Sequence, residues 1–324
     1  MDHVWITRAV MSASEPEILE CAIRGSHLHA SVLGKSNGLS SIGRMAFPDV
    51  CLDTAALAAP MLFTGEMPHD RLTMIYVREC PSDGHSFNFS TTHRAGVIGV
   101  FAPGAELDAA TPAGYTNATF SIPVHLLAKR LNSTVQDEWL SKGAVLKLPD
   151  DLRRTMDAFL SDLETWSRSA AGSVELSSAA PRIEEELIER FLGATPYFPN
   201  ELGAAGRGHL RRRYAKMRRV RDFLREHSTS PVRVDELCDA VGMSRRGLEY
   251  LFRDLLGIGV NAFIRHMRLQ GARRAILHAD PTPGGVKRIA LEWGFWHLGR
   301  FSAEYKSQFG ELPTATMARF ARRS

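Results

Sequence analysis

Two patterns of hydrophobic and polar positions divide the chain. Between residues 39 and 123, short runs rich in Val, Ile, Phe, Tyr and Thr are separated by Pro, Gly, Asp or Asn, which is the pattern of β-strands joined by turns. The clearest predicted strands are residues 72–80, 85–93, 95–103 and 115–123. Short strands at this spacing are typical of a small barrel or sandwich.

Helical spacing of apolar residues replaces the strand pattern in the second half. Residues 151–166 and 182–192 are predicted helices, and the Ser- and Ala-rich segment 167–181 is a predicted loop. The Pro- and Gly-rich segment that follows has the composition of an interdomain linker. We therefore expect an α+β protein with two domains. Their predicted bounds are 1–195 and 210–324, joined by the linker 196–209.

Within the second domain, residues 210–227 predict a basic helix, and two later stretches share one arrangement. Residues 234–256 and 286–309 each contain a short amphipathic helix, a turn with a glycine, and a second helix with an apolar stripe. Gly242 and Gly294 occupy the turns, where a left-handed backbone is needed. Each stretch has the pattern of a helix-turn-helix unit.

The segment between the two units predicts a spacer. Residues 261–277 read as one continuous helix, which at 1.5 Å per residue measures roughly 24 Å. Successive major grooves on one face of DNA lie about 34 Å apart, so a rigid spacer of this size lets two units enter adjacent grooves. The predicted partner is double-stranded DNA.

The charge distribution agrees with this prediction. Residues 1–206 carry a net charge of −9 and residues 207–324 carry +13, although the whole chain has only +4. A basic domain concentrates near phosphates because binding releases condensed counterions. The acidic part is expected to face away from DNA.

The sequence gives little support for a metal site, a disulfide framework or a catalytic site. The cysteines, Cys21, Cys51, Cys80 and Cys238, are far apart, so neither a zinc site nor a disulfide framework is predicted. His27 and His29 resemble half of a cupin metal motif without the nearby Glu. His85 and His93 lie at the ends of one predicted strand, about 26 Å apart, too far to share a metal unless the chain turns between them. We expect no metal, no required cofactor and no catalysis.

No apolar run approaches the roughly 18 residues of a membrane span, and the first residues lack the apolar core of a secretory signal. We therefore expect a cytoplasmic protein that does not enter membranes and that joins the bacterial nucleoid when it binds DNA.

The C-terminal region, residues 213–320, resembles the DNA-binding domain of the arabinose/xylose-regulator (AraC/XylS) class of bacterial transcription factors. The matching positions in the two units and the spacer include Leu237, Gly242, Ser244, Leu248, Phe252, Arg268, Leu269, Ala272, Arg273, Ile289, Ala290, Gly294, Phe295, Phe301, Lys306, Phe309, Gly310 and Pro313. The resemblance implies an N-terminal cupin-like β-barrel with helices that senses a small effector. It also implies activation of a catabolic operon and contact with RNA polymerase. Homodimerisation is expected through residues 151–166 and 182–192.

The resemblance also assigns DNA contacts. It implies that Arg246, Glu249 and Tyr250 address base edges in one groove and that Arg300, beside His297 and Gly299, does so in the next. Arginine can pair with guanine O6 and N7, and glutamate can accept from cytosine N4. Lys306, Arg253 and the helix N-termini are assigned to phosphates. The full predicted set is Ser244, Arg245, Arg246, Glu249, Tyr250, Arg253, His297, Gly299, Arg300 and Lys306.

Within this class, residues 244–269 and 292–313 are most similar to the ethanolamine-utilisation branch. Two departures from the wider class agree with that branch, since Gly299 replaces the usual Ser and Trp296-His297 replaces a small polar pair. That similarity implies ethanolamine with a cobalamin as the signal. The pocket residues stay unknown.

Three alternatives remain open at this point. The first is a cupin-type enzyme with an accessory helical domain. The second is a nonspecific nucleoid protein, and the third is a regulator of the same class that responds to a different small molecule.

Overall fold

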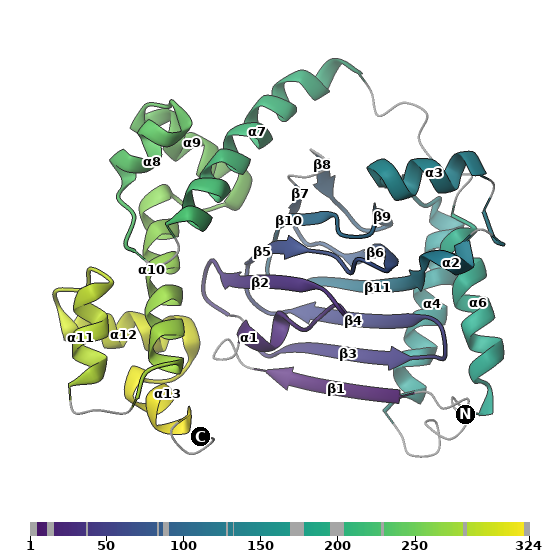
Figure 1. Cartoon of the computed structure of the whole chain (residues 1–324), viewed down its shortest axis with the longest axis horizontal. Coiled ribbons are helices and arrows are strands. Elements are labelled where there is room, and N and C mark those ends of the chain that lie inside the picture. The colour runs from purple at the N-terminus through teal and green to yellow at the C-terminus, as the bar shows by residue number, and fades with distance from the viewer. Residues whose placement is uncertain are drawn as a thin grey trace.

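The computed structural model describes residues 5–11, 16–36, 38–82, 84–86, 91–127, 129–131, 133–168, 178–194, 204–227, 230–280 and 284–320. Two antiparallel sheets form the N-terminal part (Figure 1). The seven-stranded sheet runs in the order β1 (Trp5–Met11), β3 (Ser40–Ala46), β4 (Cys51–Leu57), β11 (Tyr115–Pro123), β6 (Arg71–Glu79), β9 (Val97–Phe101) and β12 (Ala144–Lys147). The five-stranded sheet runs in the order β2 (His27–Val32), β5 (Met61–Glu66), β10 (Glu106–Thr111), β7 (Gly84–Ser86) and β8 (Thr91–His93).

The two sheets are not joined into a closed barrel by the pairings of the described residues, so the expected cupin-like barrel is corrected to two facing sheets. One predicted strand is also corrected. Residues 85–93 do not form a single strand, because the chain reverses and β7 pairs antiparallel with β8, with His85 opposite Thr92 and Gly84 opposite His93. The other three clear predictions are confirmed as β6, β9 and β11.

Helices cover the outer face of the seven-stranded sheet. They are α2 (Val124–Leu127), α3 (Ser133–Lys142), α4 (Asp150–Trp166) and α6 (Ala180–Leu192), while α1 (Pro16–Leu19) lies beside β2 (Figure 1). The apolar sides of α4 and α6 join the main core, where Phe191 stacks on Phe120 with ring centroids 4.8 Å apart. These two helices were predicted, with starts one and two residues later than observed.

The remaining helices form the C-terminal part. They are α7 (Ala204–Glu226), α8 (Val234–Val241), α9 (Arg245–Leu256), α10 (Val260–Leu277), α11 (Gly285–Glu292), α12 (Leu298–Phe309) and α13 (Pro313–Phe320). The expected linker 196–209 is shortened, because α7 begins at Ala204 rather than at residue 210. The rest of that linker that precedes α7 lies outside the described residues. Gly242 and Gly294 adopt φ values of 61° and 80°, so both turn glycines have the left-handed backbone that the sequence predicted.

The pair α8 and α9 lies at one end of α10, and the pair α11 and α12 lies at the other end (Figure 1). Helix α10 has 18 residues and therefore measures about 27 Å. It packs against the first pair through Phe263, whose ring meets that of Phe252 edge-on at 4.8 Å. On the side of the second pair it contributes Leu269, Ala272 and Ile276 to one core. The spacer is thus held by packing at both ends.

Gly271 sets how closely the second pair approaches α10. A Cβ at this position would overlap the six-membered ring of Trp293, whereas a Cβ on Gly299 of α12 would meet nothing within 4 Å. We expect Gly271→Ala to lower the free energy of unfolding by about 1–3 kcal/mol through overpacking. Gly299→Ala is the matched control and should be neutral or stabilise by up to about 1 kcal/mol, since alanine favours helices. Urea unfolding of both variants measures this, and equal stabilities would contradict the packing described.

Candidate nucleic-acid interface and internal cavity

Helix α9 presents a polar surface on the side opposite its buried stripe. Its core residues are Leu248, Leu251, Phe252 and Leu255. Ser244 precedes the helix and caps it, because its Oγ accepts a hydrogen bond from the backbone N–H of Gly247 at 3.2 Å. The predicted contact residues exposed on this helix are Ser244, Arg245, Arg246, Tyr250 and Arg253.

Glu249 differs from its predicted neighbours because its carboxylate is occupied within the protein. One oxygen accepts a hydrogen bond from Arg253 Nε at 3.0 Å, and the other accepts the backbone N–H of Val260 at 3.0 Å. Both hydrogen bonds lower the pKa of Glu249, the one from Arg253 most. Val260 is the first residue of α10, so Glu249 links the first helix pair to the spacer. A contact between Glu249 and cytosine requires the carboxylate to leave one of these partners.

Helix α12 presents the second polar surface. His297 precedes the helix, and His297, Gly299, Arg300 and Lys306 are all exposed. Arg300 Nε donates to Glu304 Oε1 at 2.8 Å, an i,i+4 pair on the helix surface. The Trp296 side chain is 75% exposed beside this surface. A large apolar ring left in solvent at a helix N-terminus is available to a partner.

Two predicted contact residues have no internal partner among the described residues. Neither Arg246 nor Lys306 forms an ion pair there, whereas Arg245 lies 3.8 Å from Asp235. A cation without an internal carboxylate partner breaks no ion pair when it binds an external anion. The predicted set therefore lies on two exposed faces at the two ends of α10, with Arg246 and Lys306 the most available cations.

The N-terminal part contacts the spacer helix α10 directly. Arg273 of α10 has a fully buried side chain, and its Nε lies 2.8 Å from Glu17 Oε1 of α1. Arg274 pairs with Glu20 at 3.2 Å. Gln270 Nε2 donates to the backbone carbonyl of Ala30 in β2 at 3.0 Å. Two acidic side chains of the first domain, Glu17 and Glu20, thus bind arginines of the basic domain.

A second contact joins the five-stranded sheet to α7. Arg221 Nη1 of α7 lies 3.0 Å from Glu106 Oε2 and 3.1 Å from Asp108 Oδ2, both in β10. On the neighbouring strand, His85 Nδ1 lies 3.1 Å from the hydroxyl of Tyr214. These contacts join residues more than 100 positions apart, and no local motif in the sequence indicates them.

Asp108 is fully buried at this contact, and its ionisation is unfavourable. Burial is the main cause that raises its pKa to about 7; Glu106 and Asp222 raise it further, while Arg221 and Arg218 act in the opposite direction. Asp108 Oδ1 has no hydrogen-bond partner. The junction between the sheet and α7 therefore contains an acid that holds its proton up to near-neutral pH.

This shift predicts how stability depends on pH. Between about pH 4 and pH 7, Asp108 holds a proton in the folded protein that it lacks in the unfolded chain, so its contribution to stability is lost as the pH rises through that window. We expect this group to lower the unfolding free energy by up to about 1.4 kcal/mol per pH unit there. Asp108→Asn should flatten that dependence in urea titrations across the window. Parallel curves for both proteins would contradict the assignment.

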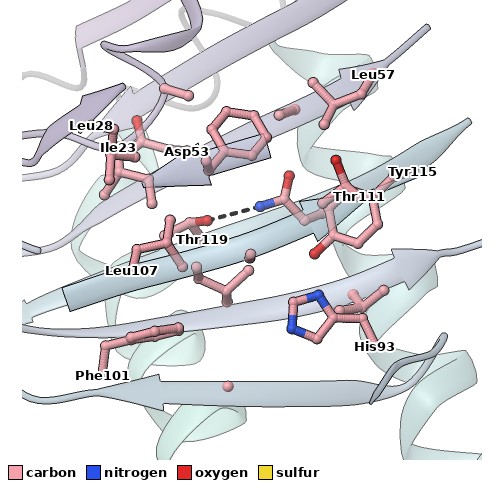
Figure 2. A pocket seen from close by; sticks show the side chains of 18 of the residues that line it. Ile23, Leu28, Asp53, Leu57, His93, Phe101, Leu107, Thr111, Tyr115 and Thr119 are labelled. Atoms are coloured by element: carbon pink, nitrogen blue, oxygen red, sulfur yellow. Dashed lines mark hydrogen bonds between the residues drawn. The ribbon is translucent and has the colours of Figure 1, made fainter. Parts of the chain in front are cut away.

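A cavity of about 60 Å³ lies between the two sheets (Figure 2). Apolar side chains from both sheets form most of its wall, among them Leu57, Phe63, Ile75, Phe101 and Leu107. The polar side chains His93, Thr111 and Tyr115 lie on one side of the cavity, and Thr119 lies nearer to Leu107 (Figure 2). Asn117 also lines the cavity, and its Nδ2 donates to Thr119 Oγ1 at 3.1 Å. Burial, and the nearby His85, lower the pKa of His93 to about 4, so its imidazole is neutral at neutral pH. The family resemblance implied a sensing domain, and the sequence analysis considered His93 only as a possible metal ligand. It indicated none of the other residues, because the cavity depends on strand pairing across the fold.

The described residues contain no group of three or more His, Cys, Asp or Glu side chains arranged to hold a metal ion. His29 lies 3.5 Å from Glu20, and His27 stands opposite Glu66 in the sheet. The four cysteines are free thiols. No described helix is both long and apolar enough to cross a bilayer.

Known proteins resemble the chain chiefly in its helical region. A family model described as a helix-turn-helix domain matches residues 237–319. A probable thc operon regulatory protein of Rhodococcus erythropolis is 41% identical over 93 residues, which are 29% of this chain and 28% of that protein. The XylDLEGF operon transcriptional activator 1 of Pseudomonas putida is 28% identical over 232 residues, which are 67% of this chain and 68% of that protein.

Among solved structures, a probable AraC family transcriptional regulator from Rhodopseudomonas palustris is 32% identical, and the match covers 33% of this chain and 97% of that one with a TM-score of 0.30. These relatives are transcription regulators rather than enzymes. The chain is a DNA-binding transcription regulator similar to these operon regulators, and residues 237–319 match a helix-turn-helix domain.

Proposed function

We propose that the protein activates transcription of a catabolic operon by binding two adjacent major grooves and that a small effector controls this binding. The observation that supports the proposal most strongly is the placement of α9 and α12, each with exposed basic residues, at the two ends of the rigid helix α10 (Figure 1). In this arrangement α9 and α12 are the recognition helices. Activation follows the precedent of the operon activators that the chain resembles.

The proposed DNA contacts divide into two kinds. Arg246, Tyr250 and Glu249 address base edges in one groove, and Arg300 with His297 does so in the next. Phosphate contacts come from Lys306, Arg253 and Arg245. Ser244 and Gly299 lie where the N-termini of α9 and α12 come close to the DNA. For Glu249 the proposal includes a cost, because its carboxylate already binds the N–H of Val260.

Effector control is supported by a direct contact between a strand that lines the cavity and helix α7 of the DNA-binding part. Strand β10 lines the cavity through Leu107, Ala109 and Thr111, while its Asp108 binds Arg221 of α7. A ligand that shifts β10 therefore changes the contact with the DNA-binding part. The ligand can shift the equilibrium only by its difference in affinity between the two arrangements.

Ethanolamine as the effector rests on sequence resemblance alone, and the apolar wall of the cavity does not favour it, because its amine is a charged ammonium group at neutral pH. A cobalamin is far larger than a cavity of about 60 Å³, so the cavity supports only a small molecule. Contact with RNA polymerase and dimerisation through α4 and α6 are proposed on the precedent of the family.

Binding selection followed by competition tests the function. Genomic fragments retained by the full-length protein yield a site, and the protein should prefer that site over random duplex by about 10³-fold or more. A promoter that carries the site should then give more transcript with the protein than without it. Equal affinity for selected and random DNA would establish a nonspecific binder instead.

A further inference from the structure

The cavity between the sheets has polar atoms that lack partners. Thr111 is 6% exposed, and its Oγ1 has no hydrogen-bond partner. His93 is half-buried, but its Nδ1 atom is shielded from solvent and also has no hydrogen-bond partner. Both residues line the cavity, and in the view of Figure 2 both side chains lie on the same side of it. Buried polar groups are almost always hydrogen-bonded, so two unpaired ones that face the same cavity offer hydrogen bonds to a molecule bound there.

The wall offers no free charge to a ligand. Neither Lys nor Arg is among the described residues that line the cavity, and Asp53 is the one acidic side chain among them. The oxygens of Asp53 already accept hydrogen bonds from Arg44 Nε at 2.5 Å and from the backbone N–H of Arg24 at 2.9 Å. His93 is neutral, because burial lowers its pKa to about 4. An ammonium or carboxylate group inside the cavity would therefore lie in an apolar site without a counter-charge.

The volume limits the size of the ligand. A water-sized group needs roughly 10–15 Å³ of such space. The cavity of about 60 Å³ therefore holds about four to six non-hydrogen atoms, most of which contact hydrocarbon.

We propose that the cavity binds a short-chain, uncharged alcohol or primary amide whose polar group hydrogen-bonds with both His93 and Thr111. A threonine hydroxyl can donate and accept, and one ring nitrogen of a neutral imidazole donates while the other accepts. A ligand group that both donates and accepts a hydrogen bond satisfies the two unpaired atoms. The alkyl chain of the ligand then lies against residues such as Phe63, Ile75 and Phe101. This assignment rests on the proposed function in one respect only, namely that the ligand is the effector.

A series of isosteric four-carbon compounds tests the ligand class. Calorimetry at pH 7 with the full-length protein compares 1-butanol and butanamide with n-butylammonium and butanoate. We expect the two neutral compounds to bind and the two charged compounds to bind at least ~100-fold more weakly, since a buried charge without a partner is strongly disfavoured. Charged compounds that bind as well as the neutral ones, or no binding by any of the four, would overturn the proposal.

Two variants locate the binding. Thr111→Val keeps the side-chain shape and removes only the hydroxyl, so it should weaken butanamide binding about tenfold. Thr155→Val, on the exposed side of α4, is the control and should leave it unchanged. A Thr111→Val protein with unaltered melting and unaltered ligand affinity would contradict the site. DNA affinity of the ligand-free protein is measured on the same samples, so a failure of the ligand class and a failure of the DNA-binding function give different results.

Discussion

Replacing Arg246 or Arg300 by alanine should each lower the affinity for the cognate site by about 1–3 kcal/mol and relax base preference at one or two positions. The two residues lie on different recognition helices, more than 50 positions apart in the chain and at opposite ends of α10, so the two losses should add in the double variant. Arg300 must also leave Glu304, which lies 2.8 Å away, and its loss should therefore be the smaller of the two.

Quantitative binding to the selected site and to its single-base variants measures these effects. Lys306→Ala provides a contrast, because loss of a phosphate contact weakens binding to all sequences and lowers the salt slope by about one unit. Arg130→Ala is the matched surface control, since its partner Glu185 lies in α6, on the far side of the sheets from α9 and α12 (Figure 1). Wild-type affinity in both Arg246→Ala and Arg300→Ala would show that these helices do not contact bases.

The second large effect concerns Arg273, whose charge is buried where three elements meet. Its guanidinium lies 2.8 Å from Glu17 of α1 and 2.9 Å from Glu311, which precedes α13, and it lies 5.0 Å above the ring of Phe309. Arg273→Ala removes one partner of a buried pair and leaves two carboxylates without it. We expect the free energy of unfolding to fall by about 3 kcal/mol.

Arg274 is the control on the same helix. Its side chain is 38% exposed and pairs with Glu20 at 3.2 Å, so Arg274→Ala should cost under about 1 kcal/mol. Urea unfolding distinguishes the two variants. If Arg273→Ala is no less stable than Arg274→Ala, the interface between α1 and α10 does not hold the domains as described.

The helical part of the fold was predictable because its signals are local. Glycine at Gly242 and Gly294, a serine cap at Ser244 and apolar residues at helical spacing located α8 to α12 to within about two residues. The sheets were less predictable. Residues 85–93 have continuous strand composition, and only pairing across the sheet shows that the chain reverses between β7 and β8.

The same distinction applies to the sites. Exposure of Arg246, Arg300 and Lys306 followed from helical periodicity. The hydrogen bond that Glu249 accepts from Val260 did not follow from periodicity. It spans eleven positions and depends on the direction in which α10 begins after the first unit. The contact from Gln270 to Ala30 joins residues 240 positions apart, and no spacing rule reaches that far.

Hydroxyl-radical footprinting of the full-length protein on its selected site tests the central claim most directly. Two recognition helices joined by α10, about 27 Å long, should protect two segments on the same face of the duplex, one helical turn of about 10 base pairs apart. Arg300→Ala should weaken one segment and Arg246→Ala the other. Protection confined to a single turn, with both variants affecting the same segment, would contradict binding to two adjacent grooves.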